Sequence, residues 1–221
     1  MDFDFSPVID NWRFFAGGLG ITVALSAITA VASLLLGLTI ALLRLYGPRW
    51  LRILLVFYID SMRAIPVLVV LVWIYFALPV TTGVTFPPFW AALVALTLHI
   101  AAYAAEVTRA GIESVRQGQM RAGLALGMSR AQALRKIILP QAVVRMLPAI
   151  GSLLTLIIKD TAIATVIAVP ELMHRADTIS GQSYQPVSVY TAVVVIYFAI
   201  LFPVTRGMER LYQRYAHLGR S

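Results

Sequence analysis

An uncharged run of 30 residues, from Phe14 to Leu43, is the feature that most limits how this chain can fold. A helix needs about 20 consecutive apolar residues to cross the roughly 30 Å hydrocarbon core of a bilayer. A second uncharged run, from Val187 to Thr205, has 19 residues. Only 13% of the 221 residues are charged, whereas a soluble globular domain carries about 25%. The sequence therefore predicts an all-α, polytopic membrane protein.

Five segments are long and apolar enough to cross the membrane, and we predict a single transmembrane domain over residues 1–221. The predicted spans are about 18–43, 56–78, 89–107, 147–169 and 186–205. The acidic N-terminus lacks the positively charged region of a secretory signal, so the first span is expected to be retained.

The basic residues outside these spans predict the orientation. Fourteen lie on one side: Arg44, Arg49, Arg52, Arg109, Arg116, Arg121, Arg130, Arg135, Lys136, Arg145, Arg206, Arg210, Arg214 and Arg220. The other side carries Arg13 and Arg175. Loops rich in Lys and Arg stay in the cytoplasm, so we predict the N-terminus outside and the C-terminus inside. Topology thereby accounts for most of the net charge of +8, and no nucleic-acid partner is predicted.

Several kinds of site are excluded by missing residues. The chain has no cysteine, which excludes disulfides and thiolate metal sites. The three histidines (His99, His174 and His217) show no ligand spacing, so no metal site is predicted. There is no G-x4-G-K-[ST] phosphate loop around the only lysines, Lys136 and Lys159. We predict that the chain is not an enzyme and binds no cofactor itself.

The predicted cytoplasmic loop, about 108–146, is more ordered than topology requires. Its central stretch reads RAGLALGMSRAQALRKIILP, with apolar residues at helical spacing. Gly127 is typical of a helix stop and Ser129 of an N-cap. Pro140 and Pro148 are expected to mark the return to the membrane. We predict two short helices, for which the residues alone allow two roles: an amphipathic pair on anionic lipid, or a docking site for a cytoplasmic partner.

This stretch resembles the coupling loop of ABC importer permeases, whose signature is roughly E-A-A-x3-G-x9-I-x-L-P. The matching residues are Ala122, Gly127, Ile137, Leu139 and Pro140. Two positions depart from the signature, because Arg121 stands in place of the glutamate and Gly123 in place of the second alanine.

Nearly the whole chain is similar to one branch of these permeases, the polar amino-acid permeases related to the histidine, glutamine and arginine systems. The residues that carry this similarity are Tyr103, Glu106, Arg109, Gly111, Ile112, Gly118 and Gln119, the motifs ALGMS, LPQA and KDT, and Arg63 with Pro66. In the last element Ala64 and Ile65 replace the glycine and threonine of the usual R-G-T-P.

The resemblance implies a type I importer fold in a bacterial inner membrane. Two permeases, either two copies or this chain with a paralogue, would each bind a cytoplasmic ATPase that holds ATP and Mg. An extracytoplasmic binding protein would deliver the amino acid. The loop would insert into the ATPase as a coupling helix. Through it, ATP binding would shift the permease pair between its inward-facing and outward-facing states.

The resemblance also implies which residues contact the ATPase: Gly118, Gln119, Arg121, Ala122, Gly123, Ala125, Gly127, Ile137, Leu139 and Pro140. The small residues among them would allow close approach of two backbones, or would pack against the permease's own helices instead. Opposite Arg121 the ATPase would present an acid or a carbonyl.

Charged and polar residues within predicted spans are candidates for function. We expect Asp160, with Thr161 and Tyr103, to line the substrate path, where Asp160 could receive an ammonium group. The alternative is that Asp160 braces a broken helix or pairs with Lys159 across a dimer. The spacing of Asp60 and Arg63 predicts an ion pair on one helix face.

Other polar positions favour structural roles. Glu106 and Arg109 are expected to brace the start of the loop, and His99 to make a helix–helix hydrogen bond. The link Thr81 to Pro88 and the segment 171–186 are predicted to lie outside, as surfaces for the binding protein or as ordinary loops.

The predicted function is the membrane-spanning permease subunit of an ATP-driven amino-acid importer. One alternative is a secondary transporter or channel subunit for small polar solutes, and another is a membrane scaffold that recruits a partner.

Overall fold

The computed structural model describes residues 4–216 as a helical protein without strands. His217 and Arg220 lie outside the described residues. The helices are α1 (Ser6–Asp10), α2 (Trp12–Tyr46), α3 (Arg49–Ala64), α4 (Val67–Val72), η1 (Trp73–Ala77), α5 (Leu78–Thr82), α6 (Pro88–Glu113), α7 (Gln117–Ala125), α8 (Arg130–Ala133), η2 (Leu134–Ile138), α9 (Leu139–Asp160), η3 (Thr161–Ile167), α10 (Leu172–Ser183) and α11 (Pro186–Tyr215). Here η1 and η2 are π-helical and η3 is a 3₁₀-helix.

Four helices in the described part of the chain are long and apolar enough to cross a membrane: Trp12–Tyr46, Pro88–Glu113, Arg130–Ile167 and Pro186–Tyr215. The pair Arg49–Ala64 and Val67–Thr82 makes a fifth candidate if it counts as one broken span. Large apolar side chains on these elements are exposed, including Val31, Phe57 and Phe198. Water would disfavour such a surface and lipid would cover it, so the structure confirms the predicted all-α membrane class.

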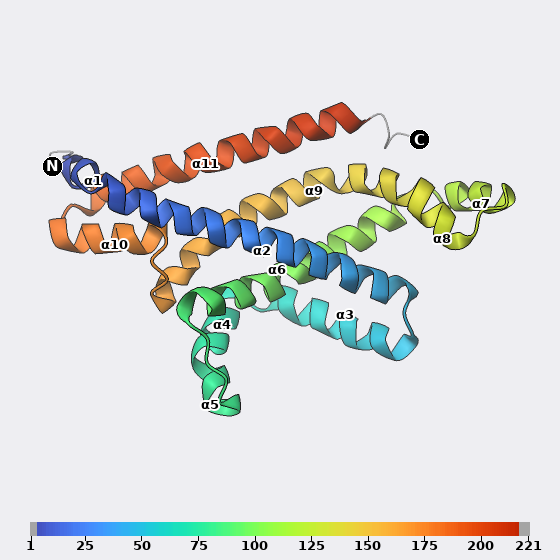
Figure 1. Cartoon of the computed structure of the whole chain (residues 1–221), viewed down its shortest axis with the longest axis horizontal. Coiled ribbons are helices and arrows are strands. Elements are labelled where there is room, and N and C mark those ends of the chain that lie inside the picture. Colours follow the sequence, from blue (N-terminus) through green and yellow to red (C-terminus); the bar gives the residue numbers. More distant parts are fainter. Residues whose placement is uncertain (1–3, 217–221) are drawn as a thin grey trace.

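The second span is not the straight helix that the sequence predicts between residues 56 and 78. It bends by 107° between α3 and α4. Ile65 has an extended backbone there, at φ −91° and ψ 133°, because Pro66 disfavours helical geometry in the residue before it and has no N–H to donate. As a result α4, η1 and α5 turn away from the direction of α2 and α6 (Figure 1).

The fourth span also differs from its predicted form. A nearly continuous helical path runs from Arg130 to Ile167, through both prolines that were expected to mark the return to the membrane. Pro140 lies in the first turn of α9, directly after the wider π-turns of η2. Wider turns of this kind accommodate a break in the regular hydrogen-bond ladder. Pro148 is tolerated inside α9.

Close packing between α2 and α6 forms the centre of the molecule. A Cβ atom at Gly37 would lie 2.5 Å from Ala104 Cβ, 2.9 Å from Ala105 N and 3.0 Å from Ala101 O. Gly37 therefore allows the two backbones to approach, as small residues do at interfaces between membrane helices.

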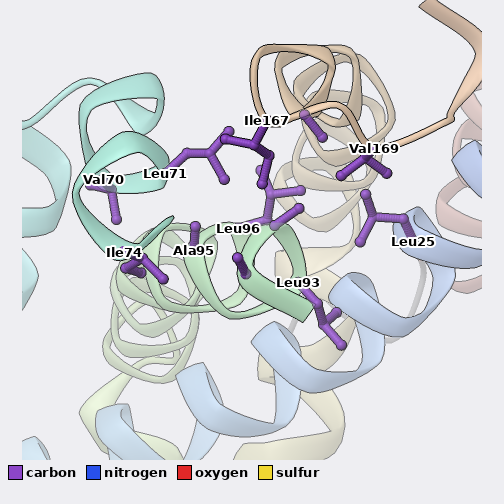
Figure 2. Close-up of a cluster of buried hydrophobic side chains, with 12 residues drawn as sticks. Leu25, Val70, Leu71, Ile74, Leu93, Ala95, Leu96, Ile167 and Val169 are labelled. Atoms are coloured by element: carbon purple, nitrogen blue, oxygen red, sulfur yellow. The ribbon is translucent and has the colours of Figure 1, made fainter. Parts of the chain in front are cut away.

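A buried apolar cluster joins this centre to the bent span and to the end of the fourth span. It brings together Leu25 of α2, Leu71 of α4, Leu96 of α6 and Ile167 of η3 (Figure 2). The cluster holds η3, and hence the end of α9 that carries Asp160, against α4 and α6.

Candidate coupling and translocation sites

The predicted stop at Gly127 and N-cap at Ser129 are confirmed. Gly127 adopts φ +80°, a left-handed conformation that glycine reaches without the clash of a Cβ atom. The N–H of Met128 donates to Gly123 O at 3.1 Å, and that of Gly127 to Leu124 O at 3.0 Å. This pattern of two bonds closes α7. Ser129 and Gln132 then form a capping box that starts α8.

The small residues of α7 divide between two faces. A Cβ atom at Gly123 would lie 3.0 Å from Ile137 Cδ1 and 3.1 Å from Ala133 Cβ, so Gly123 packs against this chain's own α8 and η2. Ala122, Ala125 and Gly127 are exposed. A Cβ atom at Gly127 would have no neighbour within 4 Å. Packing against the permease's own helices thus applies to Gly123, and contact with the ATPase stays a prediction for the exposed positions.

The exposed face of α7 ends in apolar side chains. Leu126 is 80% exposed, and Leu124 is also exposed. Arg121 and Gly118 are exposed as well, whereas Gln119 is half-buried. Farther along the loop, Ile137 and Leu139 are half-buried and Pro140 is exposed. The part of the predicted set that a partner could contact therefore centres on α7 and Gly127, at one end of the molecule (Figure 1).

A charged network fixes the base of this loop to the membrane helices. Arg44 Nη1 of α2 donates to Glu106 Oε2 of α6 at 2.6 Å. Arg109 donates to both Glu106 and Glu113, and Arg145 of α9 donates to Ser114 O. The prediction that Glu106 and Arg109 brace the start of the loop is confirmed, with Arg44 as a further partner.

The predicted ion pair between Asp60 and Arg63 is wrong for the described residues. Arg63 instead lies over the ring of Tyr103, 5.6 Å from its centroid, and Tyr103 Oη donates to Arg63 O at 3.4 Å. Both residues lie on α3, which ends at Ala64, but the guanidinium of Arg63 contacts Tyr103 of α6 instead of Asp60.

His99 does not make the predicted helix–helix hydrogen bond through Nδ1. Its ring is buried against Tyr103, with 5.3 Å between centroids, and Nδ1 has no partner among the described residues.

The predicted path residues take up different environments. Asp160 ends α9 and is half-buried, whereas Lys159 beside it is exposed. Thr161 is buried and its hydroxyl donates to Ile158 O at 2.7 Å. Within residues 4–216 no hydrogen bond or ion pair joins Asp160 to Thr161 or Tyr103. Asp160 also lies at a change of helix type near the end of its span, rather than at the middle.

A cavity between α9 and α11 was not predicted. It has a volume of about 290 Å³ and is lined by Pro148, Gly151, Ser152, Thr155, Thr205, Met208, Glu209 and Tyr212. The hydroxyl groups on α9 are spaced by three residues, at Ser152 and Thr155, which places them on one helix face. The spacing of Ser152 and Thr155 is visible in the sequence. The residues of α11 that face them are about 50 positions away, so the sequence alone did not indicate the cavity.

Glu171 is a second buried feature that sequence reasoning missed. Its side chain is fully buried. It accepts a hydrogen bond from His174 N at 2.8 Å, which caps α10, and one from Thr22 Oγ1 at 3.2 Å. Thr22 in turn accepts from Leu172 N at 3.1 Å. These bonds join α10 to α2, and burial raises the pKa of the Glu171 carboxyl.

Glu171→Ala is expected to lower the free energy of unfolding by about 1–3 kcal/mol, because it leaves Thr22 and the His174 N–H without their acceptor. Glu171→Gln keeps an acceptor and should retain most of that stability. Since the raised pKa makes the folded state bind a proton more tightly than the unfolded chain, stability should fall as pH rises through the raised value. Thermal unfolding over a pH series should show this dependence in the wild type and its loss in Glu171→Gln; an unchanged slope in the variant would contradict it.

Comparison with known proteins decides the family. The model of the family "Binding-protein-dependent transport system inner membrane component" matches residues 33–217. The chain belongs to this family. The resemblance seen in the sequence is confirmed, and the chain is a transport subunit of the ABC importer class whose ATPase is a separate subunit.

Relatives of this permease extend over almost its whole length. The probable amino-acid ABC transporter permease YckA of Bacillus subtilis is 35% identical, over 97% of this chain and 95% of its own. The arginine transport system permease ArtQ of the same organism is 34% identical, over 95% and 97%. The glutamine transport system permease GlnP of Escherichia coli K12 is 35% identical, over 97% and 98%.

Solved structures agree with the fold of the permease. A crystal structure of an amino acid ABC transporter with histidines has a TM-score of 0.90 and 33% identity, and the match covers 97% of this chain and all of that one. An inward-facing structure of the MetNI methionine ABC transporter has a TM-score of 0.80 at 19% identity, over 93% and 97%. The latter supports the fold alone.

Proposed function

We propose that this permease carries amino acids across a bacterial inner membrane and that its α7–Gly127 element docks a separate ATPase. The observation that carries the proposal is the exposed apolar tip at Leu126. It stands on a well-capped helix whose base is tied to α2 and α6 through Arg44 and Glu106. A helix that only rested on lipid would not need to be attached to α2 and α6. A helix that transmits force from a partner would need this attachment.

The amino-acid substrate is supported by the relatives named above and by polar groups that line the cavity between α9 and α11. Ser152 and Thr155 offer two hydroxyls to a solute there, and Glu209, which pairs with Arg206 at 3.0 Å, adds a carboxylate beyond the end of the predicted fifth span. Asp160 lies farther along α9, toward the opposite end of the helix. We propose that these groups provide successive polar contacts along one side of the path.

The proposed orientation places α7 in the cytoplasm and α10 outside. The two elements lie at opposite ends of the molecule (Figure 1). In this arrangement α10 is offered to the amino-acid-binding protein. A second permease, as a copy or a paralogue, completes the assembly, and ATP with Mg binds on the ATPase.

The test is co-reconstitution of this permease with the ATPase and binding protein encoded beside it. ATP hydrolysis and uptake are measured while amino acids are supplied one at a time. Stimulation of both by one chemical class supports the proposal. Uptake that requires a proton gradient instead of ATP would favour a secondary transporter, and hydrolysis without uptake of any amino acid would favour a scaffold.

Asp160→Asn should lower the uptake of cationic amino acids about tenfold or more while changing neutral ones less, because a carboxylate paired with an ammonium contributes more than an amide does. Initial rates of uptake for one cationic and one neutral substrate measure the difference. Thr155→Val serves as the comparison, because it removes a hydroxyl from the cavity between α9 and α11 without changing the charge. Equal loss of both substrates in Asp160→Asn would instead show that Asp160 braces the helix end.

A further inference from the structure

A basic cavity at the turn between α2 and α3 is not used by the proposed transport path. It has a volume of about 670 Å³ and is lined by Arg44, Leu45, Gly47, Arg49, Arg52, Ile53 and Val56. Three of these seven residues are arginines and none is acidic. The turn lies toward the end of the molecule that carries α7 and α8 (Figure 1).

Two of the three arginines are available to a ligand. Arg49 and Arg52 are exposed, and the guanidinium of neither makes a hydrogen bond or an ion pair within the part of the chain that the structure describes. Arg44 is the exception, because it already binds Glu106. The cavity therefore presents two guanidinium groups without a counter-ion, and guanidinium groups bind phosphate through paired hydrogen bonds.

Below the charged groups, α3 presents a surface suited to acyl chains. Arg49, Ile53 and Phe57 are spaced by four residues and so share one helix face. Ile53 is 62% exposed and Phe57 is 73% exposed. Trp50, beside Arg49, is also exposed, and tryptophan is enriched at the level of lipid headgroups. Along this face, cationic residues are followed by apolar ones. In the same way, the charged headgroup of a phospholipid is followed by its apolar acyl chains.

We propose that this cavity binds the headgroup of an anionic phospholipid. The phosphate contacts Arg49 and Arg52, and one acyl chain follows Ile53 and Phe57. Basic pockets between transmembrane helices bind such headgroups through the same combination of charge and adjacent hydrocarbon. The apolar face favours a lipid over free phosphate, because inorganic phosphate has no hydrocarbon that could pack against it.

The site has a direct connection to the base of the coupling loop. Arg44 lines the cavity and also donates to Glu106, which accepts from Arg109 just before α7. A phosphate held by Arg49 and Arg52 therefore brings negative charge close to Arg44, whose guanidinium stays on Glu106. Occupancy of the site would shift the balance of charge on the network that holds α7.

Native mass spectrometry of the purified permease–ATPase complex in detergent tests the site. The complex is titrated with phosphatidylglycerol, phosphatidylcholine or inorganic phosphate, and bound ligand is counted per permease. The test variant is Arg49→Gln with Arg52→Gln. The matched control is Arg210→Gln with Arg214→Gln, which removes the same charge from exposed positions near the end of α11.

Phosphatidylglycerol should bind the wild type and the control alike, and the test variant about tenfold or more weakly. An Arg49→Lys, Arg52→Lys variant should recover most of the binding, which also shows that the fold is intact. Equal binding of phosphatidylglycerol by the test and control variants would overturn the proposal. So would wild-type binding of phosphatidylcholine, or of inorganic phosphate, with the affinity shown for phosphatidylglycerol. Because these measurements do not involve transport, they can fail independently of the proposed function.

Discussion

Gly127→Asp is expected to abolish substrate-stimulated ATP hydrolysis by the assembled importer while the permease still inserts and assembles. Gly127 ends α7 on the exposed tip, and a Cβ atom there would meet nothing within this chain. Apart from the strain that the positive φ of Gly127 imposes on any residue with a Cβ atom, the new side chain therefore acts on a partner. A carboxylate enclosed at a docking surface without a counter-ion costs several kcal/mol, and 1.4 kcal/mol corresponds to a factor of ten in binding. Coupled hydrolysis should fall at least about tenfold.

Two controls separate charge from backbone strain. Gly127→Asn has nearly the same shape and tolerates a positive φ about as well as aspartate, but it is neutral, so it should keep more coupled hydrolysis. Gly207→Asp adds the same charge on α11, at another position where a Cβ atom has open space, and should behave as the wild type. Full coupling in Gly127→Asp would refute the docking role, and equal loss in Gly127→Asn would assign the effect to the backbone.

Gly37→Val should produce the largest loss of stability among substitutions in the α2–α6 contact. The nearest atoms to a new Cβ include the backbone N of Ala105 and O of Ala101, which can move only if the helices separate. Overpacking of this kind typically costs about 1–3 kcal/mol, and contacts with backbone atoms favour the upper end of that range. Thermal unfolding of the purified permease in detergent should show a clearly lower midpoint.

Gly20→Val is the matched control for this substitution. Gly20 lies on the same helix, and a Cβ atom there has no neighbour within 4 Å. The same change of residue at Gly20 should leave the unfolding midpoint nearly unchanged. Equal midpoints for the two variants would mean that α2 and α6 do not pack as closely as the structure has them.

Sequence reasoning succeeded where the cause was local or compositional. The uncharged run from Phe14 to Leu43 required a membrane, since no soluble core would need 30 such residues in succession. The stop at Gly127 and the cap at Ser129 depend on backbone geometry within a few residues. The membrane span, the helix stop and the N-cap could all be predicted from residues that are close together in the sequence.

The remaining features depend on contacts between distant segments. Glu171 binds Thr22, which lies 149 positions earlier, and no periodicity in either segment indicates that contact. The bend at Pro66 was not predicted, and its size follows from how α4 packs on α6 and η3. Arg63 was assigned to Asp60 from their spacing along one helix alone. Its guanidinium lies over Tyr103 of α6 instead, a contact between residues 40 positions apart.

The helical path from Arg130 to Asp160 has a mechanical consequence. At 1.5 Å per residue, 31 residues span roughly 45 Å, so one stiff rod extends from the cap beside Gly127 to the carboxylate at the end of α9. A displacement applied to α8 would arrive at η3 almost undiminished unless the rod flexes. Its compliance is concentrated at the π-turns of η2 and at Pro148, where backbone hydrogen bonding is weakened. The flexibility at η2 and at Pro148 therefore determines how much of a displacement of α8 is transmitted to η3.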